Sequence, residues 1–149
     1  MKTTTEIFAK RTAQLIHRIT FQMDKQGERV LQDKHDLTLS QFFVLMQMAN
    51  GRQCQRDLAE QLGVTPAAVS RHVSLLMKRG YLQRMPHEAD RRYGYLEVSE
   101  KGLDTYRAAE TTLSEYFDTT YRGLSAEQKQ RIDHALTDLA DCFCKHEDC

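Results

Sequence analysis

The chain has 149 residues, of which 40% are hydrophobic and 28% charged, with seven glycines and two prolines, a composition that excludes a disordered chain. This length suits one domain or two small lobes that share a core. No apolar run approaches the roughly 20 residues that span a bilayer, and "MKTTTEIFAKRTAQ" lacks the apolar stretch of a secretory signal. We therefore expect a cytoplasmic protein with no membrane partner.

The formal charge is zero overall but uneven along the chain. Residues 52–92 hold eight basic and four acidic side chains, whereas residues 93–149 hold six and twelve. A neutral total can therefore conceal a local basic surface, which is the feature that a phosphate backbone attracts.

The first third of the chain predicts two helices. Between residues 5 and 34 the apolar side chains recur at helical spacing, and only Gly27 is expected to weaken this long amphipathic helix. In "HDLTLSQ", Thr38 and Gln41 have the spacing of a capping box, which predicts the start of a second helix that ends at Asn50-Gly51. The apolar positions of the first helix are Phe8, Leu15, Ile19, Met23 and Val30.

The middle third predicts two shorter helices and a hairpin. "QRDLAEQLG" is typical of a short helix that stops at Gly63, and a fourth helix then begins with Thr65 as its N-cap and Pro66 in its first turn, and ends at Gly80. The segments "YLQRM" and "YGYLEV" are rich in strand-forming residues, and the polar connector "PHEADRR" separates them. They predict a hairpin with a charged tip.

Two further helices complete the predicted fold. Ser99 is placed to cap a long helix, and Ser125 with Gln128 repeats the capping-box spacing before a last amphipathic helix. The fold class is therefore mainly α with a small β-hairpin wing, in the order of four helices, two strands and two helices.

The fourth helix has two distinct faces. At about 100° per residue, Val69, Val73 and Leu76 share one stripe, which we expect to enter the core. The opposite face is small, polar and basic, as suits a helix that enters a major groove and reads base edges and phosphates. The simpler alternative is an ordinary solvated face. Together with the residues that begin the helix, the predicted DNA-binding residues are Thr65, Pro66, Ala67, Ser70, Arg71, Ser74 and Lys78.

The context of this helix favours DNA binding over the simpler alternative. A short helix, a glycine turn, a capped helix and a charged hairpin form a helix-turn-helix with a wing. At the tip of the wing, Arg91 and Arg92 could enter a minor groove, whose negative potential attracts arginine.

The chain resembles the MarR family, the multiple-antibiotic-resistance regulators, which are dimeric winged-helix repressors. The resemblance runs from "LTLSQFFVLMQMA" through "RDLAEQLGVTPAAVSRHVSLLMKRGYLQR" to "ADRRYGYLEVSEKG", about Leu37 to Gly102. It implies a DNA-binding lobe at residues 37–102, a helical dimerisation region at residues 1–36 and 103–149, and a wing tip at Asp90, Arg91 and Arg92. In the family the aspartate commonly steadies an arginine, a role that we carry over to Asp90. The resemblance also implies a small aromatic effector.

A homodimer is expected on physical grounds too. The terminal helices are amphipathic and have no large domain between them to cover, so a second subunit is the simplest cover for their apolar faces. Two-fold symmetry then predicts a pseudopalindromic DNA target with half-sites one helical turn apart. The alternative is a monomer whose terminal helices pack on its own winged lobe.

Four cysteines add a possible signal. Cys142, Cys144 and Cys149 lie near His146 and could hold zinc, form redox-sensitive bonds or belong to an inert tail. Cys54 precedes the third helix, where a helix N-terminus can lower a thiol pKa and make the residue a redox sensor, although inert packing is the simpler reading.

The sequence therefore predicts a sequence-specific DNA-binding regulator, more specifically a repressor released by a ligand or by a thiol or metal signal. Two other functions are considered. A protein-protein adaptor could use the same winged helix without specific DNA binding, and a Cys/His-dependent enzyme needs no contiguous motif. The P-loop, dinucleotide, zinc-protease and serine-hydrolase motifs are absent from the sequence, so we predict no enzyme.

Overall fold

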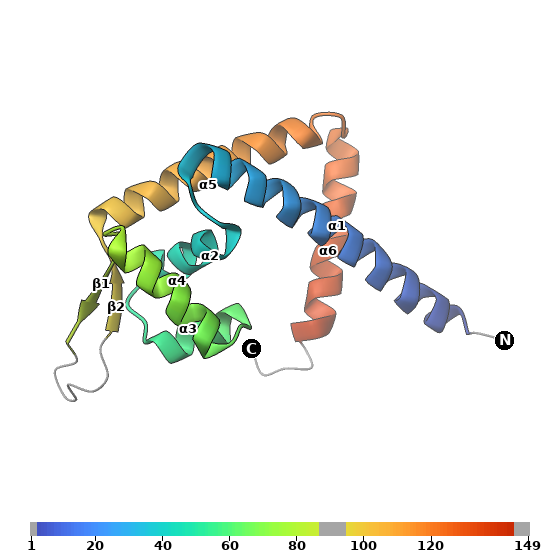
Figure 1. The fold of residues 1–149 in the computed structure, drawn as a ribbon. Coiled ribbons are helices and arrows are strands. Elements are labelled where there is room, and N and C mark those ends of the chain that lie inside the picture. Colours follow the sequence, from blue (N-terminus) through green and yellow to red (C-terminus); the bar gives the residue numbers. More distant parts are fainter. Residues whose placement is uncertain (1–2, 87–94, 145–149) are drawn as a thin grey trace. The chain divides into compact units, whose positions relative to one another are not determined.

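The computed structural model describes residues 3–86 and 95–144, except the side chain of Cys144 (Figure 1). The chain divides into two compact units, Met1–Leu113 and Ser114–Cys149, and each is described by itself. The predicted boundaries of the dimerisation region and the DNA-binding lobe remain a prediction.

The order of elements confirms the predicted fold class. Within the described ranges the chain forms six helices and one antiparallel hairpin. They are α1 (Thr4–His35), α2 (Leu39–Ala49), α3 (Gln55–Leu62), α4 (Pro66–Lys78), β1 (Leu82–Met85), β2 (Tyr95–Val98), α5 (Glu100–Tyr121) and α6 (Ala126–Cys144). No helix in the described part of the chain is long and apolar enough to cross a membrane.

Helix α1 runs through Gly27 without interruption. Gly27 is buried, and a Cβ placed there would lie 3.5 Å from Leu39 Cδ1 and 3.8 Å from Leu113 Cδ2. Both distances are ordinary van der Waals contacts, so a methyl group would fit at this position and the packing does not require a glycine. Leu31 anchors the same end of α1 and is fully buried.

The start of α2 is fixed by its own cap and by α1. Thr38 Oγ1 accepts from the amide of Gln41, whose side chain accepts from the amide of Thr38, so the predicted capping box is present. Glu28 on α1 accepts a hydrogen bond from the amide of Leu39, which satisfies another free N–H group of the first turn.

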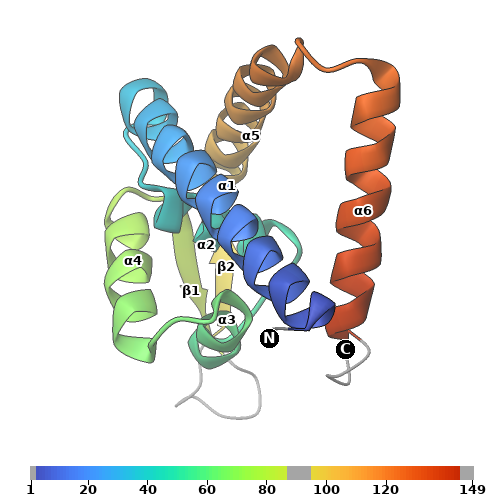
Figure 2. The ribbon, with the colours of Figure 1, turned by 90° about the vertical axis from the view of Figure 1, so that its right-hand side faces the viewer.

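Helices α2, α3 and α4 lie together with the hairpin (Figure 2), and one hydrophobic core joins them. Leu45 of α2 and Leu58 of α3 are fully buried, and so is Leu96 of β2. Together with the buried stripe of α4, these side chains hold the helices and the sheet in one body. The remaining fully buried large side chains are Leu31, Leu37, Met48, Leu76, Val44, Val69 and Val73.

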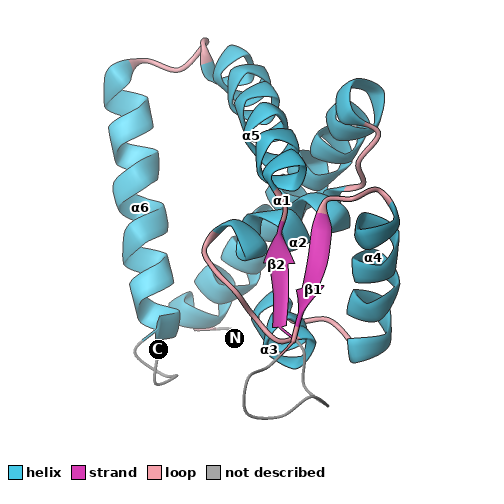
Figure 3. Ribbon diagram, turned by 90° about the vertical axis from the view of Figure 1, so that its left-hand side faces the viewer, coloured by secondary structure: helices cyan, strands magenta, loops and turns pink. Residues whose placement is uncertain are grey.

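The hairpin pairs β1 with β2 in an antiparallel register from Leu82↔Val98 to Met85↔Tyr95, and β1 lies beside α4 (Figure 3). Gln53 adds a bridge to Leu96, with N···O distances of 3.3 and 2.8 Å. The loop between α2 and α3 therefore extends the sheet by one residue pair.

In the second unit, α5 continues to Tyr121 and a short turn leads into α6. Ser125 and Gln128 form the predicted capping box, with N···O distances of 2.8 and 3.2 Å. The apolar residues of α6 are largely exposed, since Ile132, Leu136 and Phe143 expose 45%, 55% and 70% of their surfaces.

Candidate nucleic-acid interface

The turn between α3 and α4 is fixed by a glycine at its centre. Gly63 has φ 62°, in the left-handed region, and its N–H donates to Glu60 O while Val64 N–H donates to Ala59 O. Thr65 then caps α4, its Oγ1 accepting from the amide of Ala68 at 3.2 Å. The turn and the cap together define where α4 begins.

Helix α3 starts with a cysteine in place of the usual oxygen cap. Cys54 has extended backbone angles, and its Sγ accepts from the amide of Asp57 at 3.4 Å. Its side chain is half-buried. The predicted redox residue is therefore a sulfur N-cap, which accepts hydrogen bonds more weakly than a hydroxyl.

The two faces of α4 lie as the sequence predicted. Val69, Val73 and Leu76 are at most 1% exposed and form the core side. The predicted contact residues are on the exposed side of the helix or at its exposed start, and these are Thr65, Pro66, Ala67, Ser70, Arg71, Ser74 and Lys78. A helix that is anchored in this way presents small and basic groups without obstruction.

The exposed face of α4 has favourable electrostatics for an anion. Among the described residues, the Arg71 side chain makes no ion pair or hydrogen bond, so its guanidinium donors are available to a ligand. The N-terminus of α4 adds the positive end of the helix dipole. Burial and, secondly, the charge of Arg71 hold the pKa of His72 below its ordinary value of 6.5, which disfavours the charged form of the ring beside this face.

Two apolar residues on or beside the exposed face were not predicted as site residues. Leu75 is 42% exposed and Val64 is 45% exposed. Leu75 follows Arg71 by four positions and therefore lies on the same side of α4. The spacing of Leu75 from Arg71 can be read from the sequence. An exposed leucine on this face suits an apolar contact with the methyl group of thymine.

The base of the wing is held by polar contacts. Glu97 on β2 accepts from Arg52 Nε and from Gln83 Nε2, both at 3.0 Å. These hydrogen bonds, with the charge of Arg52, lower the pKa of Glu97. The predicted wing-tip residues Asp90, Arg91 and Arg92 lie outside the described residues.

The C-terminal cluster is described only in part. Cys142 is exposed in the last turn of α6, and Cys144 ends the helix. His146 and Cys149 lie outside the described residues, so the predicted zinc or redox cluster stays a prediction. Within residues 3–86 and 95–143, no three His, Cys, Asp or Glu side chains are grouped to hold a metal.

Known proteins share the helix-turn-helix and hairpin described above. Residues 35–92, from the end of α1 into the hairpin, match the MarR family. The chain is 26% identical over 100 residues to the HTH-type transcriptional regulator BilQ of Clostridium symbiosum, covering 66% of this chain and 69% of that protein. It is 27% identical over 107 residues to the HTH-type transcriptional regulator SarZ of Staphylococcus haemolyticus, covering 69% of each.

Solved structures show the same fold. The transcriptional regulator BldR from Sulfolobus solfataricus superposes with a TM-score of 0.81 at 19% identity, covering 97% of this chain and 99% of that one. A mutant MarR from E. coli complexed with operator DNA superposes with a TM-score of 0.73 at 20% identity, covering 93% and 99%. The fold is thus that of the MarR winged-helix proteins.

Proposed function

We propose that this chain, whose residues 35–92 match the MarR family, is a sequence-specific DNA-binding transcriptional regulator of that family. The observation that carries the proposal is the division of α4 into a fully buried apolar stripe and an exposed small and basic face. The named relatives are HTH-type transcriptional regulators, and one structural neighbour is a MarR complexed with operator DNA. The chain is accordingly a regulator and not an enzyme.

In this proposal α4 enters the major groove. Ser70, Arg71 and Ser74 face the base edges, because small side chains let the helix approach closely and the arginine fork matches guanine. Thr65, Pro66, Ala67 and Lys78 lie toward the sugar-phosphate backbone and set the register. The wing tip, residues 90–92, would lie in the adjacent minor groove.

The proposed regulator is a homodimer. Helix α1 exposes a run of large apolar side chains along its first twenty residues, and such a surface is rarely left uncovered. A second copy of the chain would cover it and would pair two α4 helices on a pseudopalindromic site. The exposed apolar residues are Ile7, Phe8, Leu15, Ile19, Phe21 and Met23, each between 38% and 64% exposed.

We further propose that the protein is a repressor that a signal releases from DNA. A small aromatic effector is one such signal, in keeping with the family. A thiol signal at Cys54 is another, since its sulfur caps α3 and a modified sulfur would no longer accept the amide of Asp57. Zinc at the C-terminal residues Cys142, Cys144, His146 and Cys149 is a third.

The direct test is a titration of the protein with DNA. Fluorescence polarisation would compare a duplex selected by the wild-type protein from a random pool with a random-sequence duplex of equal length. The selected duplex should bind far more tightly, and affinity for both should fall steeply as salt rises, because several phosphate contacts release counterions. Equal affinity for the two duplexes, or an affinity that does not change with salt, would instead favour the protein-protein adaptor.

A further inference from the structure

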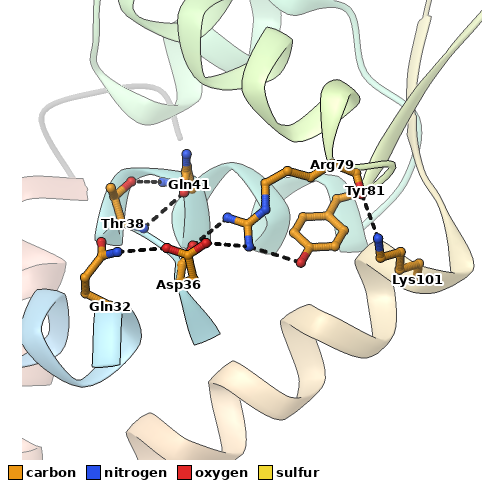
Figure 4. A network of polar contacts seen from close by, with 7 residues as sticks. All are labelled: Gln32, Asp36, Thr38, Gln41, Arg79, Tyr81 and Lys101. Carbon is orange, nitrogen blue, oxygen red and sulfur yellow. Dashed lines mark hydrogen bonds and ion pairs between the residues drawn. The ribbon is translucent and has the colours of Figure 1, made fainter. Parts of the chain in front are cut away.

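The end of α1 and the end of α4 are joined by one arginine side chain (Figure 4). Arg79 is the C-cap of α4, and its Nη1 donates to the main-chain oxygen of Asp36, the C-cap of α1. Its Nη2 lies 3.4 Å from Oδ2 of the same Asp36. The two arms of the guanidinium therefore hold the backbone and the side chain of a single residue, 43 positions away in the sequence.

Asp36 sits where the backbone makes a sharp bend. Its φ of 51° places it in the left-handed region, and among the described residues it is the one non-glycine with positive φ. The side chain of Gln32 donates to Asp36 Oδ1 at 3.0 Å, so the bend is held from α1 as well as from α4. The amides of Asp36 and Leu37 donate to the main-chain oxygens of Gln32 and Leu31, so main-chain and side-chain contacts together fix the direction in which the chain leaves α1.

Arg79 is itself held in place. Its guanidinium carbon lies 4.9 Å from the centre of the Tyr81 ring, and Nη2 donates to the Tyr81 hydroxyl at 3.2 Å. Tyr81 is buried, with 8% of its surface exposed. Lys101 at the start of α5 donates to the main-chain oxygen of Arg79 at 2.9 Å, where a cation suits the C-terminal end of a helix.

This joint contributes little to stability by charge alone. The side chain of Asp36 is 80% exposed, and solvent screens an ion pair of that kind. What the joint provides is geometry, because the planar fork of arginine meets two acceptors at once and lysine cannot do the same. It connects α1, which carries the proposed dimer surface, with α4, which carries the proposed DNA surface.

We propose that Arg79 is a positioning residue that fixes the angle of α4 relative to α1 and thereby sets the half-site spacing that the dimer accepts. The proposal rests on the proposed function, since spacing has meaning only for a dimer on a two-part site. Arg79 itself does not contact DNA in this account. Removal of the Arg79 side chain should let the angle between α1 and α4 vary. The contacts of α4 with DNA phosphates should remain.

The test uses the duplex selected by the wild-type protein, versions with one base pair added or removed between its half-sites, and a random-sequence duplex. Arg79→Gln removes the fork and the charge. Arg29→Gln is the matched control, because it removes the same charge from an exposed ion pair on α1, where Arg29 lies 3.8 Å from Asp33. Circular dichroism and thermal melting would establish that each variant is folded.

We expect Arg79→Gln to bind the selected duplex about tenfold more weakly and to lose most of the difference between correct and altered spacing. Its affinity for random DNA should match that of Arg29→Gln, and Arg79→Lys should not restore the spacing preference. A variant that keeps the wild-type spacing preference would overturn the proposal, as would equal losses on selected and random DNA. If wild-type protein does not distinguish the duplexes, the proposed function fails first.

A second variant keeps the test decisive if Arg79→Gln does not fold. Asp36→Asn removes the carboxylate that Arg79 contacts, and asparagine tolerates the left-handed conformation as well as aspartate does. The main-chain oxygen of Asp36 remains as an acceptor for Arg79. We therefore expect Asp36→Asn to lose part of the half-site spacing preference, but less of it than Arg79→Gln loses. Wild-type spacing preference in Asp36→Asn would then count against the proposal.

Discussion

Gly102 lies directly against the main-chain carbonyl of Tyr81. A Cβ at position 102 would come within 2.1 Å of that oxygen and 2.9 Å of the Tyr81 carbonyl carbon. The approach lets α5 begin beside the turn that follows α4, where Ser99 Oγ also donates to Gly80 O at 2.6 Å. We expect Gly102→Ala to lower the free energy of unfolding by about 1–3 kcal/mol, since backbone atoms must shift.

Urea denaturation would measure this loss, and Gly123→Ala provides the control. No heavy atom lies within 4 Å of a Cβ at position 123, so that variant should be neutral or slightly more stable. Similar stabilities for the two alanine variants would contradict the close approach of α5 to Tyr81.

His72 should make the stability of the protein depend on pH. Burial, and secondly the charge of Arg71, holds its pKa below 6.5 in the folded protein, whereas the unfolded chain takes up a proton near 6.5. The free energy of unfolding should therefore fall as the pH drops from 6.5 to the pKa of His72 in the folded protein. Below that pKa, His72 should cause no further loss of stability. His72→Gln should remove this component of the pH dependence.

The pKa of His72 can be followed by NMR titration of its ring. Arg71→Ala should raise that pKa only part of the way toward its ordinary value, because burial is the larger cause. A wild-type value at or above 6.5 would show that the ring is not placed as described.

Replacing an apolar residue on α1 should disrupt the proposed dimer. Ile19 is 52% exposed, and Ile19→Glu would place a charge within the surface that a second copy covers. Analytical ultracentrifugation should detect a weaker dimer, with weaker DNA binding as a consequence. Arg29→Gln changes the charge by the same amount beyond the end of this apolar run, where the Arg29 side chain is 85% exposed, and should leave assembly unchanged. A monomeric wild-type protein would refute the dimer outright.

Cys54→Ser should make the protein more stable. The serine hydroxyl is a stronger acceptor than sulfur for the amide of Asp57, so we expect a gain of about 0.5–1 kcal/mol in the free energy of unfolding. If Cys54 is also the proposed redox sensor, the variant should keep its DNA affinity and stay bound when peroxide is added. If peroxide releases the Cys54→Ser protein from DNA as readily as wild type, Cys54 is not the redox sensor. A loss of stability in this variant would contradict the role of Cys54 as the cap of α3.

Much of this architecture follows from short-range sequence signals. The capping boxes at Thr38 and Ser125, the glycine at position 63 and the spacing of the valines in α4 each act within a few residues, and the structure confirms them. Together with the strand-forming runs "YLQRM" and "YGYLEV", they predict the order of elements and the buried and exposed faces of α4.

The contacts that join distant elements could not be predicted in this way. Arg79 and Asp36 are far apart in the sequence, and nothing local in either segment indicates that they meet. Gly102 likewise lies within an ordinary helical pattern in the sequence. Only the structure shows that the main-chain oxygen of Tyr81 leaves no room for a side chain there. Both depend on how helices pack, which periodicity alone does not specify.

The decisive measurement is the contribution of Arg71 to specific recognition of DNA by α4. Arg71→Ala and a control, Arg107→Ala, each remove one exposed arginine, the latter from α5 where it lies 3.9 Å from Asp104. Fluorescence polarisation should show that Arg71→Ala weakens binding to the selected duplex by about 1–3 kcal/mol and changes binding to random DNA far less, while Arg107→Ala leaves both unchanged. Equal losses on the two duplexes would reduce Arg71 to a phosphate contact, and no loss on either would mean that α4 does not read DNA.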